Sequence, residues 1–259
     1  MKKNKGMKIT ASIEARMGSS RLPGKMGMEL YKGLPALGAV IERLTACKRL
    51  DGIVVATTAK NADDNLAGIA ERYGARCFRG GEDDVLGRVV GAGKSVGADA
   101  LVLVTGDCSC ISPTLIDDGI DFYVKNHYDL VTNLVKVTYP VGVNLQVVDL
   151  SRLEESHKMA GQPPYRDDTN NFEHTNYFMI THPEIFSIFH YLAPEKYRRP
   201  DIALALDTEA DLKIMRSIYS RLYPLNKFFD TADILELLKK EPEILSPLDG
   251  LKVNRVGIK

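Results

Sequence analysis

A repeated alternation of apolar and amphipathic segments in residues 8–126 is the feature that most limits how this chain can fold. The runs Ile53–Thr57 and Ala100–Thr105 are continuously apolar or β-branched, which is typical of strands buried on both faces. Between such runs, as in residues 35–50, apolar residues recur at i, i+3, i+4 and i+7, the spacing of an amphipathic helix. This alternation predicts an α/β, Rossmann-like fold of three layers with a mainly parallel central sheet.

The same patterns predict the individual elements. In the first half we expect strands at residues 8–13, 53–57, 76–79 and 100–105, and helices at residues 35–50, 63–73, 84–95 and 113–126, the last capped by Ser112. The pattern then changes, and a small mixed β excursion is expected from strands at residues 130–132, 143–148 and 177–180, with a helix near 150–160. A further apolar strand is expected at residues 202–206, followed by helices at 208–222 and 232–240.

Composition excludes several classes of protein. The formal charge of zero leaves no overall field for nucleic acid or an anionic membrane, so we expect neither partner and look for a local anion site instead. No run approaches the roughly 20 apolar residues of a transmembrane helix, and the apolar run after the basic N-terminus is too short for a signal peptide. Four cysteines without paired spacing indicate reduced thiols. We therefore expect a cytoplasmic protein.

The segment Ala15–Lys25 directly follows the first expected strand and has the composition of a phosphate-binding loop. It holds two glycines, two serines and three cations, with no acidic residue. Met26 stands where a Walker A loop needs Ser or Thr, and the spacing does not fit Gly-x-Gly-x-x-Gly either. The alternative is an ordinary solvated basic turn.

Two aspartates, Asp107 and Asp207, each follow an expected apolar strand. If those strands lie near each other, the two carboxylates converge beside the loop at residues 15–25, because ligands of parallel sheets bind at the carboxyl ends of strands. Such a pair suits Mg²⁺ bound to nucleotide phosphates, since Mg²⁺ takes one or two protein carboxylates and fills its remaining positions with phosphate and water. Each aspartate taken alone is better explained as a helix cap or turn former than as a metal ligand.

The segment from Arg16 to Lys25, Arg-Met-Gly-Ser-Ser-Arg-Leu-Pro-Gly-Lys, resembles the nucleotide-binding signature of the cytidylyltransferases that activate acidic sugars. These are the relatives of CMP-KDO and CMP-sialate synthetases, in particular the branch of spore coat polysaccharide biosynthesis protein F. The resemblance implies a nucleotide-diphospho-sugar transferase fold. It also implies Mg²⁺-dependent transfer of CMP from CTP to a small anionic acceptor, a sugar acid of the 3-deoxy-ulosonate type or a related molecule, with release of pyrophosphate. The family's tendency to dimerise implies a homodimer.

The resemblance runs from about residue 8 to 222 and assigns roles to individual residues. Those that would bind the nucleotide are Ala15, Arg16, Gly18, Ser19, Ser20, Arg21, Lys25, Asp84, Arg88 and Gly106. Arg16, Lys25, Asp107 and Asp207 would carry catalysis, with Asp107 and Asp207 as the Mg²⁺ ligands. Those that would bind the acceptor are Tyr139, Asn144, Glu173 and His174. The alternative for these residues is a structural role. Asp84 and Arg88 would then form an i,i+4 ion pair at the start of a helix, and Glu173 and His174 would form a structural pair.

The resemblance implies a single domain, residues 1–259, with four parts. Residues 1–126 would form the nucleotide-binding half, 127–200 the excursion for acceptor binding and dimerisation, and 201–245 the returning metal-binding strand and helices. The pattern does not place the tail, residues 246–259.

The chain also departs from the branch's pattern. Asp107-Cys108-Ser109-Cys110 replaces the usual Asp-Cys-Pro, and an acidic residue is missing at Val141 or Asn144. These changes leave the identity of the acceptor undetermined. We expect Cys108 and Cys110 to pack behind the metal-binding loop. The alternative functions are a nucleotidyltransferase that uses another nucleotide with a phosphorylated acceptor, a related glycosyltransferase, and a nucleotide-binding homologue without turnover.

Overall fold

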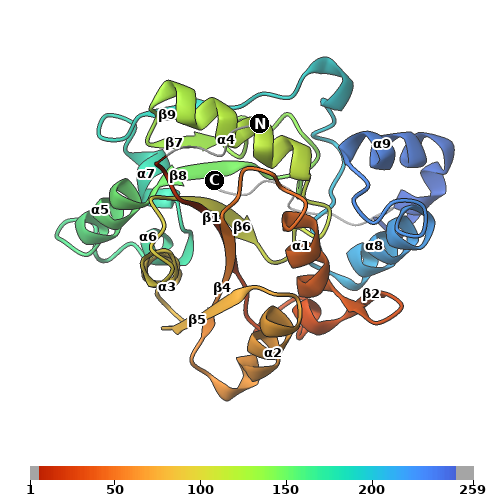
Figure 1. Ribbon diagram of the computed structural model, residues 1–259, viewed down its shortest axis with the longest axis horizontal. Helices are drawn as coiled ribbons and strands as arrows, with labels where there is room; N and C mark the ends of the chain where they lie inside the picture. Colours follow the sequence, from red (N-terminus) through yellow and green to blue (C-terminus); the bar gives the residue numbers. More distant parts are fainter. Residues whose placement is uncertain (1–5, 249–259) are drawn as a thin grey trace.

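The computed structural model describes residues 6–248, and a seven-stranded sheet forms their centre (Figure 1). The strand order is β5-β4-β1-β6-β8-β7-β9. The bounds are β1 Ile9–Glu14, β4 Gly52–Thr58, β5 Arg76–Gly80, β6 Ala100–Thr105, β7 Leu130–Thr132, β8 Gln146–Asp149 and β9 Ile188–His190. A separate two-stranded sheet consists of β2, Glu29–Tyr31, and β3, Leu34–Pro35.

The first half of the chain forms a parallel sheet, as the alternation of apolar and amphipathic segments predicts. β1 lies between β4 and β6 and is parallel to both, so Ile13 stands beside Val55 on one side and Val104 on the other. The second half makes the sheet mixed, because β8 is antiparallel to both β6 and β7. The carboxyl ends of β1 and β6 therefore lie next to each other at one edge.

Helices cover both faces of the sheet (Figure 1). Those packed in one apolar cluster are α1 Ala36–Leu44, α2 Asp64–Arg72, α4 Pro113–Asn126, α8 Glu209–Leu222 and α9 Thr231–Lys240. The opposite cluster receives α3 Val85–Ser95, α5 Leu150–Ala160 and α7 Tyr177–Thr181. In β6, Val102 belongs to the first cluster and Leu101 to the second, which explains why this strand is apolar throughout.

Three expectations about the elements are wrong. Residues 177–180 form the short helix α7 instead of a strand, and a run of four apolar residues cannot separate the two by periodicity. Residues 202–206 are extended but form no strand of the sheet, and only an isolated bridge joins Ala203 to Val141. The first long helix, expected over 35–50, ends at Leu44.

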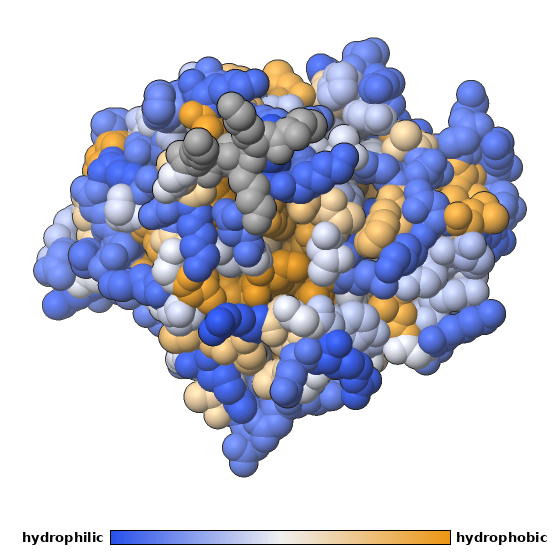
Figure 2. All heavy atoms as spheres, viewed as in Figure 1, coloured by the Kyte–Doolittle hydropathy of each residue, from blue (hydrophilic) through white to orange (hydrophobic). Residues whose placement is uncertain are grey.

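Short elements complete the described chain. These are α6 Asn170–Glu173 and the 3₁₀ helices η1 Lys25–Gly27, η2 Asn61–Asp63, η3 Glu195–Tyr197 and η4 Pro242–Leu248. Of the tail, residues 246–248 belong to η4, and residues 249–259 lie outside the described part. None of the helices in residues 6–248 has the length and apolarity that crossing a membrane requires. Figure 2 shows apolar residues gathered near the middle of one face, with mostly hydrophilic residues around them.

Candidate active site

The loop after β1 is fixed by a buried aspartate. Asp63, which is 3% exposed, accepts the Met17 backbone N–H on Oδ1 at 2.7 Å and the Thr58 hydroxyl on Oδ2. Within the loop the Met17 carbonyl accepts the N–H groups of Ser19, at 2.9 Å, and Gly24, at 3.0 Å. Backbone hydrogen bonds within the loop therefore fix its conformation, and they already use the N–H of Ser19, one of the residues expected to bind the nucleotide.

Lys25 brings the two aspartates together. Its Nζ lies 2.8 Å from Oδ1 of Asp207 and 3.3 Å from Oδ2 of Asp107. Arg21 adds a second cation, with Nη2 3.0 Å from Oδ1 of Asp207, and the Thr105 hydroxyl donates to Oδ1 of Asp107 at 2.6 Å. Residues that are about a hundred positions apart thus form one charged cluster beside the loop, as the sequence predicts.

The segment before Asp207 reaches this place without a sheet strand. The Leu206 N–H donates to the Asp107 carbonyl at 3.0 Å, which ties the two aspartate segments together directly. The Leu204 N–H donates to the Val141 carbonyl at 2.7 Å, and the Val141 N–H donates to the Ile202 carbonyl at 2.9 Å. Gly142 has φ of 94°, and a Cβ on it would lie 2.6 Å from the Leu204 carbonyl carbon. Only glycine allows these backbones to approach so closely.

A second close approach brings the end of β6 to the loop. A Cβ on Gly106 would lie 2.6 Å from Sδ of Met26 and 3.2 Å from the Glu14 carbonyl oxygen. Met26 is only 2% exposed and anchors the loop on the core. Glycine at position 106 therefore lets Asp107 come within reach of Lys25.

A cavity of about 370 Å³, which we call the loop cavity, opens over this cluster. Its lining includes the cations Arg16, Arg21, Lys25 and Arg88 and the acids Glu14, Glu173, Asp107 and Asp207. Ala15, Gly18, Ser19, Ser20 and Gly106 also line it. Four cations in one cavity suit a polyanion such as a triphosphate, because Arg16, Arg21 and Lys25 can offer it charge-assisted hydrogen bonds and Arg88 adds a nearby positive charge.

Arg88 is buried, with 3% exposure, and the protein itself holds it in place. It donates through Nη1 to the carbonyl oxygens of Gly81, at 2.5 Å, and Glu82, at 3.2 Å, and through Nε to Ala56 at 3.3 Å. Desolvation lowers the pKa of Arg88 from its usual value, and the nearby Glu14 opposes this effect. Arg88 is therefore a fixed positive wall of the loop cavity.

Asp84 is placed differently from the other expected nucleotide contacts. Its carboxyl caps α3 by accepting the Gly87 N–H at 2.7 Å, and Oδ2 lies 2.8 Å from Nε2 of His157 on α5. Asp84 is not among the residues that line the loop cavity. The structure therefore gives Asp84 two structural partners, while Val85 and Arg88 of the same helix do line that cavity.

A second cavity, of about 230 Å³, adjoins the first, and we call it the apolar cavity. Tyr139 and Asn144, expected to contact the acceptor, line this cavity, whereas Glu173 lines the loop cavity. His174 lines both, together with Glu14 and Thr105. The four residues expected to bind the acceptor are therefore divided between two connected spaces.

Glu14 is a site residue that the sequence does not reveal. It is the last residue of β1, lines both cavities, and accepts the Thr175 hydroxyl on Oε2 at 2.5 Å. Desolvation raises the pKa of this carboxyl, and the Thr175 hydrogen bond opposes the rise. Its one signal in the sequence is an acidic residue that ends an otherwise uncharged strand.

The two cysteines near Asp107 pack as expected. Cys108 is 1% exposed, and its Sγ lies 3.0 Å from the Thr105 hydroxyl and 3.2 Å from Nδ2 of Asn144. Sγ of Cys110 contacts Sδ of Met215 at 3.6 Å in the core. Burial raises the pKa of Cys110 to about 11, so it remains a neutral thiol at physiological pH.

The donors around Asp107 and Asp207 fit a nucleotide-bound Mg²⁺. Both carboxylates are about one quarter exposed and open into the loop cavity. In residues 6–248 no group of three or more His, Cys, Asp or Glu side chains is arranged to hold a metal by itself. Because Mg²⁺ accepts one or two carboxylates and completes its shell with phosphate and water, this pair suits an ion that arrives with a nucleotide.

Comparison with known proteins agrees with this geometry. The structure superposes on a cytidylyltransferase from Leptospira borgpetersenii with a TM-score of 0.84 and 31% sequence identity, covering 95% of this chain and 99% of that one. Among relatives, the uncharacterized protein MJ1063 of Methanocaldococcus jannaschii is 33% identical over 92% of this chain and 93% of its own. The spore coat polysaccharide biosynthesis protein SpsF of Bacillus subtilis is 28% identical, covering 89% and 94% of the two chains.

A further relative matches over part of the chain. The 3-deoxy-manno-octulosonate cytidylyltransferase of Geobacter sulfurreducens is 34% identical across 46% of this chain and 47% of its own. The model of the family described as cytidylyltransferase matches residues 10–227, which include the loop, both aspartates and both cavities. The chain therefore belongs to the cytidylyltransferase family, whose members are CTP-utilising nucleotidyltransferases.

Proposed function

We propose that the protein transfers CMP from CTP to a small acceptor in a Mg²⁺-dependent reaction, in surface glycan biosynthesis. The acceptor would be a sugar acid of the 3-deoxy-ulosonate type, as the name of the Geobacter relative suggests, or a related molecule. An acceptor hydroxyl oxygen would bond to the α-phosphorus of CTP and lose its proton. The bond from that phosphorus to the bridging oxygen would break, and pyrophosphate would leave.

One observation carries this proposal: Lys25 holds Asp107 and Asp207 together at the floor of a cavity lined by four cations. Phosphoryl transfer needs little covalent work from side chains, and depends on positioning and on neutralising charge on the phosphate oxygens. Arg16, Arg21 and Lys25 would bind the triphosphate, and Arg88 would stay fixed as a positive wall.

Asp107 and Asp207 would hold the metal, and a bound Mg²⁺ would supply charge neutralisation at the phosphates. Thr105 would keep Asp107 oriented through its hydroxyl, and the Leu206 N–H would keep the two aspartate segments in register. Lys25 would then be free to turn from the carboxylates toward phosphate oxygens.

The parts of the chain would divide the work accordingly. Residues 1–126 would supply most of the nucleotide contacts, 127–200 the acceptor contacts and the dimer interface, and 201–245 the second metal ligand. The apolar cavity supports the assignment of acceptor contacts to residues 127–200, because most of the residues that line it, including Tyr139 and Asn144, lie in this part.

A nucleotide panel tests the proposal without knowledge of the acceptor. We expect CTP with Mg²⁺ to raise the melting temperature more than UTP, GTP or ATP, since saturation at 100 times Kd adds about 2.7 kcal/mol to the free energy of unfolding. Pyrophosphate release with candidate sugar acids would follow. A protein that no nucleotide stabilises, or one that prefers another base, would contradict the proposal.

A further inference from the structure

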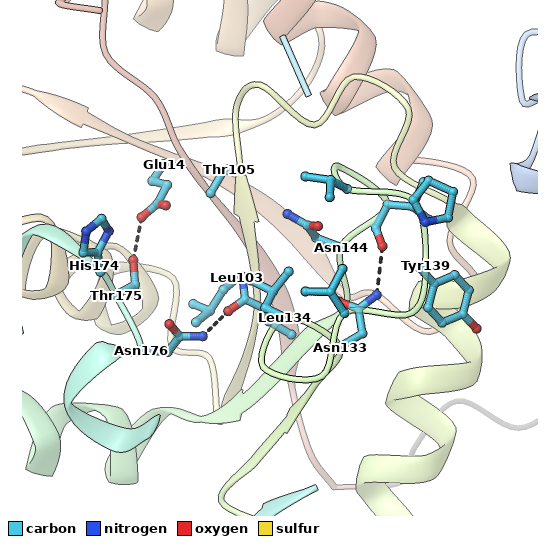
Figure 3. A pocket seen from close by; sticks show the side chains of 15 residues that line it. Glu14, Leu103, Thr105, Asn133, Leu134, Tyr139, Asn144, His174, Thr175 and Asn176 are labelled. Atoms are coloured by element: carbon cyan, nitrogen blue, oxygen red, sulfur yellow. Dashed lines mark hydrogen bonds between the residues drawn. The ribbon is translucent and has the colours of Figure 1, made fainter. Parts of the chain in front are cut away.

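A small third cavity, of about 50 Å³, adjoins the apolar cavity, and we call it the hydroxyl cavity. Tyr139 lines both spaces. Figure 3 shows Tyr139 at the end of the apolar cavity away from Glu14, with its hydroxyl pointing away from the other labelled residues. The ring of Tyr139 therefore separates the two cavities, and its hydroxyl is left for the smaller one.

The hydroxyl cavity is lined almost entirely by residues that carry side-chain oxygens. Of the described residues that line it, only Leu115 has no such oxygen. Two carboxylates line the cavity, those of Asp118 and Asp230, and the hydroxyls are those of Ser112, Thr114, Tyr139, Tyr197 and Thr231. None of these side chains carries a nitrogen atom, so they offer an anion no cationic partner. Oxygen atoms are instead the ligands of hard cations.

One of the hydroxyls is buried without a partner. Thr231 is 3% exposed, and its Oγ1 has no hydrogen-bond partner in the part of the chain that the structure describes. Burying a hydroxyl without a hydrogen bond is unfavourable. Because Thr231 lines the hydroxyl cavity, its oxygen is available to an occupant of this space. An occupant that binds oxygen would offset the cost of burying it.

The charges around the hydroxyl cavity favour a cation. Asp118 is exposed as well as part of the lining, so it stands at the opening, and its carboxylate forms no hydrogen bond or ion pair within residues 6–248. Partial desolvation raises the pKa of Asp118, and the carboxylates of Asp121, Asp117 and Asp230 raise it further. A positive ion beside Asp118 would relieve this repulsion between carboxylates.

The second carboxylate, that of Asp230, is already engaged. It accepts the Thr231 N–H at 2.7 Å and caps α9, while Oγ of Ser112 accepts the Leu115 N–H at 3.0 Å and caps α4. Helix N-termini carry partial positive charge, which the Asp230 carboxylate balances in part. One free carboxylate, Asp118, then remains among neutral hydroxyls. This charge suits a singly charged ion better than a divalent one, which needs more carboxylates or phosphates.

The ligands are held in place by a buried arginine behind them. Arg43 is 1% exposed and donates through Nε to the Ile111 carbonyl at 2.8 Å and through Nη2 to the Phe229 carbonyl. These two residues directly precede Ser112 and Asp230, so Arg43 fixes the starts of α4 and α9 next to each other. Arg43 does not line the cavity, and the charges that act most strongly on the carboxylate at its opening are all negative.

We propose that the hydroxyl cavity binds one monovalent alkali cation, Na⁺ or K⁺, through Asp118 and the hydroxyl oxygens around it. The site is separate from the loop cavity, and the inference does not depend on the proposed function. The ion gives the Thr231 oxygen a partner. It also joins the starts of α4 and α9 to Tyr139 and Tyr197, whose ring centroids lie 6.4 Å apart, and so stabilises one wall of the apolar cavity.

Thermal unfolding in matched salts tests the site. The full chain is compared in NaCl, KCl and tetramethylammonium chloride at equal ionic strength, with EDTA present to remove divalent ions. The tetramethylammonium ion serves as the reference, because its four methyl groups keep oxygen ligands away from its charge. At 10 times Kd we expect Na⁺ or K⁺ to raise the Tm by about 2–4 °C, in a saturable way.

Two ligand variants locate the ion. Asp118→Asn and Thr231→Val should each lose the rise in Tm that Na⁺ or K⁺ causes. In tetramethylammonium chloride, Thr231→Val should instead raise the Tm, because it replaces a buried hydroxyl without a partner by a methyl group of the same size. A threonine with only a structural role would not combine these two effects.

Two control variants should keep the rise. Asp167→Asn also removes one carboxylate, but Asp167 is 89% exposed and lies outside the hydroxyl cavity. Asp207→Asn removes a carboxylate of the loop cavity, so an unchanged rise in this variant separates the two sites.

Three results would overturn the inference. Equal Tm values in all three salts would mean that the hydroxyl cavity binds no alkali ion. A rise that persists in both ligand variants would place the ion elsewhere in the protein. A rise that appears only when Ca²⁺ replaces EDTA, and that the ligand variants lose, would assign the site to a divalent ion.

Discussion

At the scale of single residues, the site depends on how charges are balanced around Lys25. Without its ammonium group, the Asp107 and Asp207 carboxylates would face each other across a partly buried space. Lysine binds phosphate as a flexible point charge, so under the proposed function Lys25 would exchange a carboxylate partner for a phosphate when CTP and Mg²⁺ bind. The cluster of Lys25, Asp107 and Asp207 is therefore consistent with a site that binds a phosphate group and a metal ion together.

Replacing one of the carboxylates tests this balance. We expect Asp207→Asn to keep the fold, because asparagine has the same size, but to lose about 10²-fold or more in kcat, as for removal of an electrostatic stabiliser. Pyrophosphate release and a thermal melt measure the two effects. Asp167→Asn is the control, since Asp167 is 89% exposed and lines neither cavity. Undiminished turnover of the Asp207 variant at saturating Mg²⁺ would rule out its metal role.

At the scale of elements, two tertiary contacts position the site. Residues 139–144 pack against 202–206 through Gly142, which places the extended segment before Asp207. On the other face, Asp84 and His157 tie the start of α3 to α5, and α3 carries Arg88. Both contacts join segments more than sixty residues apart, so neither is visible in a local pattern.

Gly142→Ala tests the first contact. We expect it to lower the free energy of unfolding by about 1–3 kcal/mol, because alanine is strained at φ of 94° and its Cβ would meet the Leu204 carbonyl. Turnover should fall as well, because Asp207 lies just beyond. Gly161→Ala is the control, with φ of −75° and no backbone atom closer than 3.6 Å to the added Cβ. Chemical denaturation would show equal stability of the two variants if the contact were unimportant.

The second contact predicts a pH dependence. The hydrogen bond to Asp84 raises the pKa of His157, so the stabilisation by charged His157 is complete below the unfolded value of 6.5 and is lost as the pH rises through the raised value. Burial alone would raise the pKa of Asp84, but its hydrogen bonds to His157 and Gly87 lower it below the unfolded value of 3.8. The stabilisation by the Asp84 carboxylate is therefore complete above pH 3.8 and is lost as the pH falls through the lowered pKa of the folded state.

A double-mutant cycle with His157→Gln and Asp84→Asn measures this pair, and asparagine keeps the helix cap. We expect a coupling energy of about 0.5–1 kcal/mol at pH 5.5, since both side chains are partly exposed, and a smaller one at pH 9, where the imidazole is neutral and only an uncharged donor remains. The same coupling at both pH values would contradict a charged pair.

At the scale of the whole molecule, the sheet gathers the site from distant parts of the chain. The carboxyl ends of β1 and β6 are adjacent, and the segment at 202–207 closes over them from the second half. Both apolar clusters pack on this one sheet. Ligand binding at its edge should therefore stabilise the molecule as a whole.

Metal removal is the corresponding prediction. We expect EDTA to abolish turnover and the Mg²⁺-dependent part of the CTP-induced rise in Tm, while the Tm without nucleotide stays unchanged. The reason is that residues 6–248 contain no cluster of three metal-binding side chains that would hold a structural ion. A fall in Tm of the nucleotide-free protein on chelation, followed by recovery with Mg²⁺, would show that the metal also supports the fold.

The sequence by itself determined the parallel half of the sheet, the cation-rich loop after β1 and the two aspartates that meet beside it. Strands buried on both faces are largely apolar, and ligands of parallel sheets bind at the carboxyl ends of such strands, so these features leave a local pattern. Tertiary structure alone decided that residues 177–180 are helical, that residues 202–206 stay outside the sheet, and that Glu14 joins two cavities. Those outcomes depend on partners far away in the sequence, such as Thr175 for Glu14 and Val141 for Leu204, which no local pattern specifies.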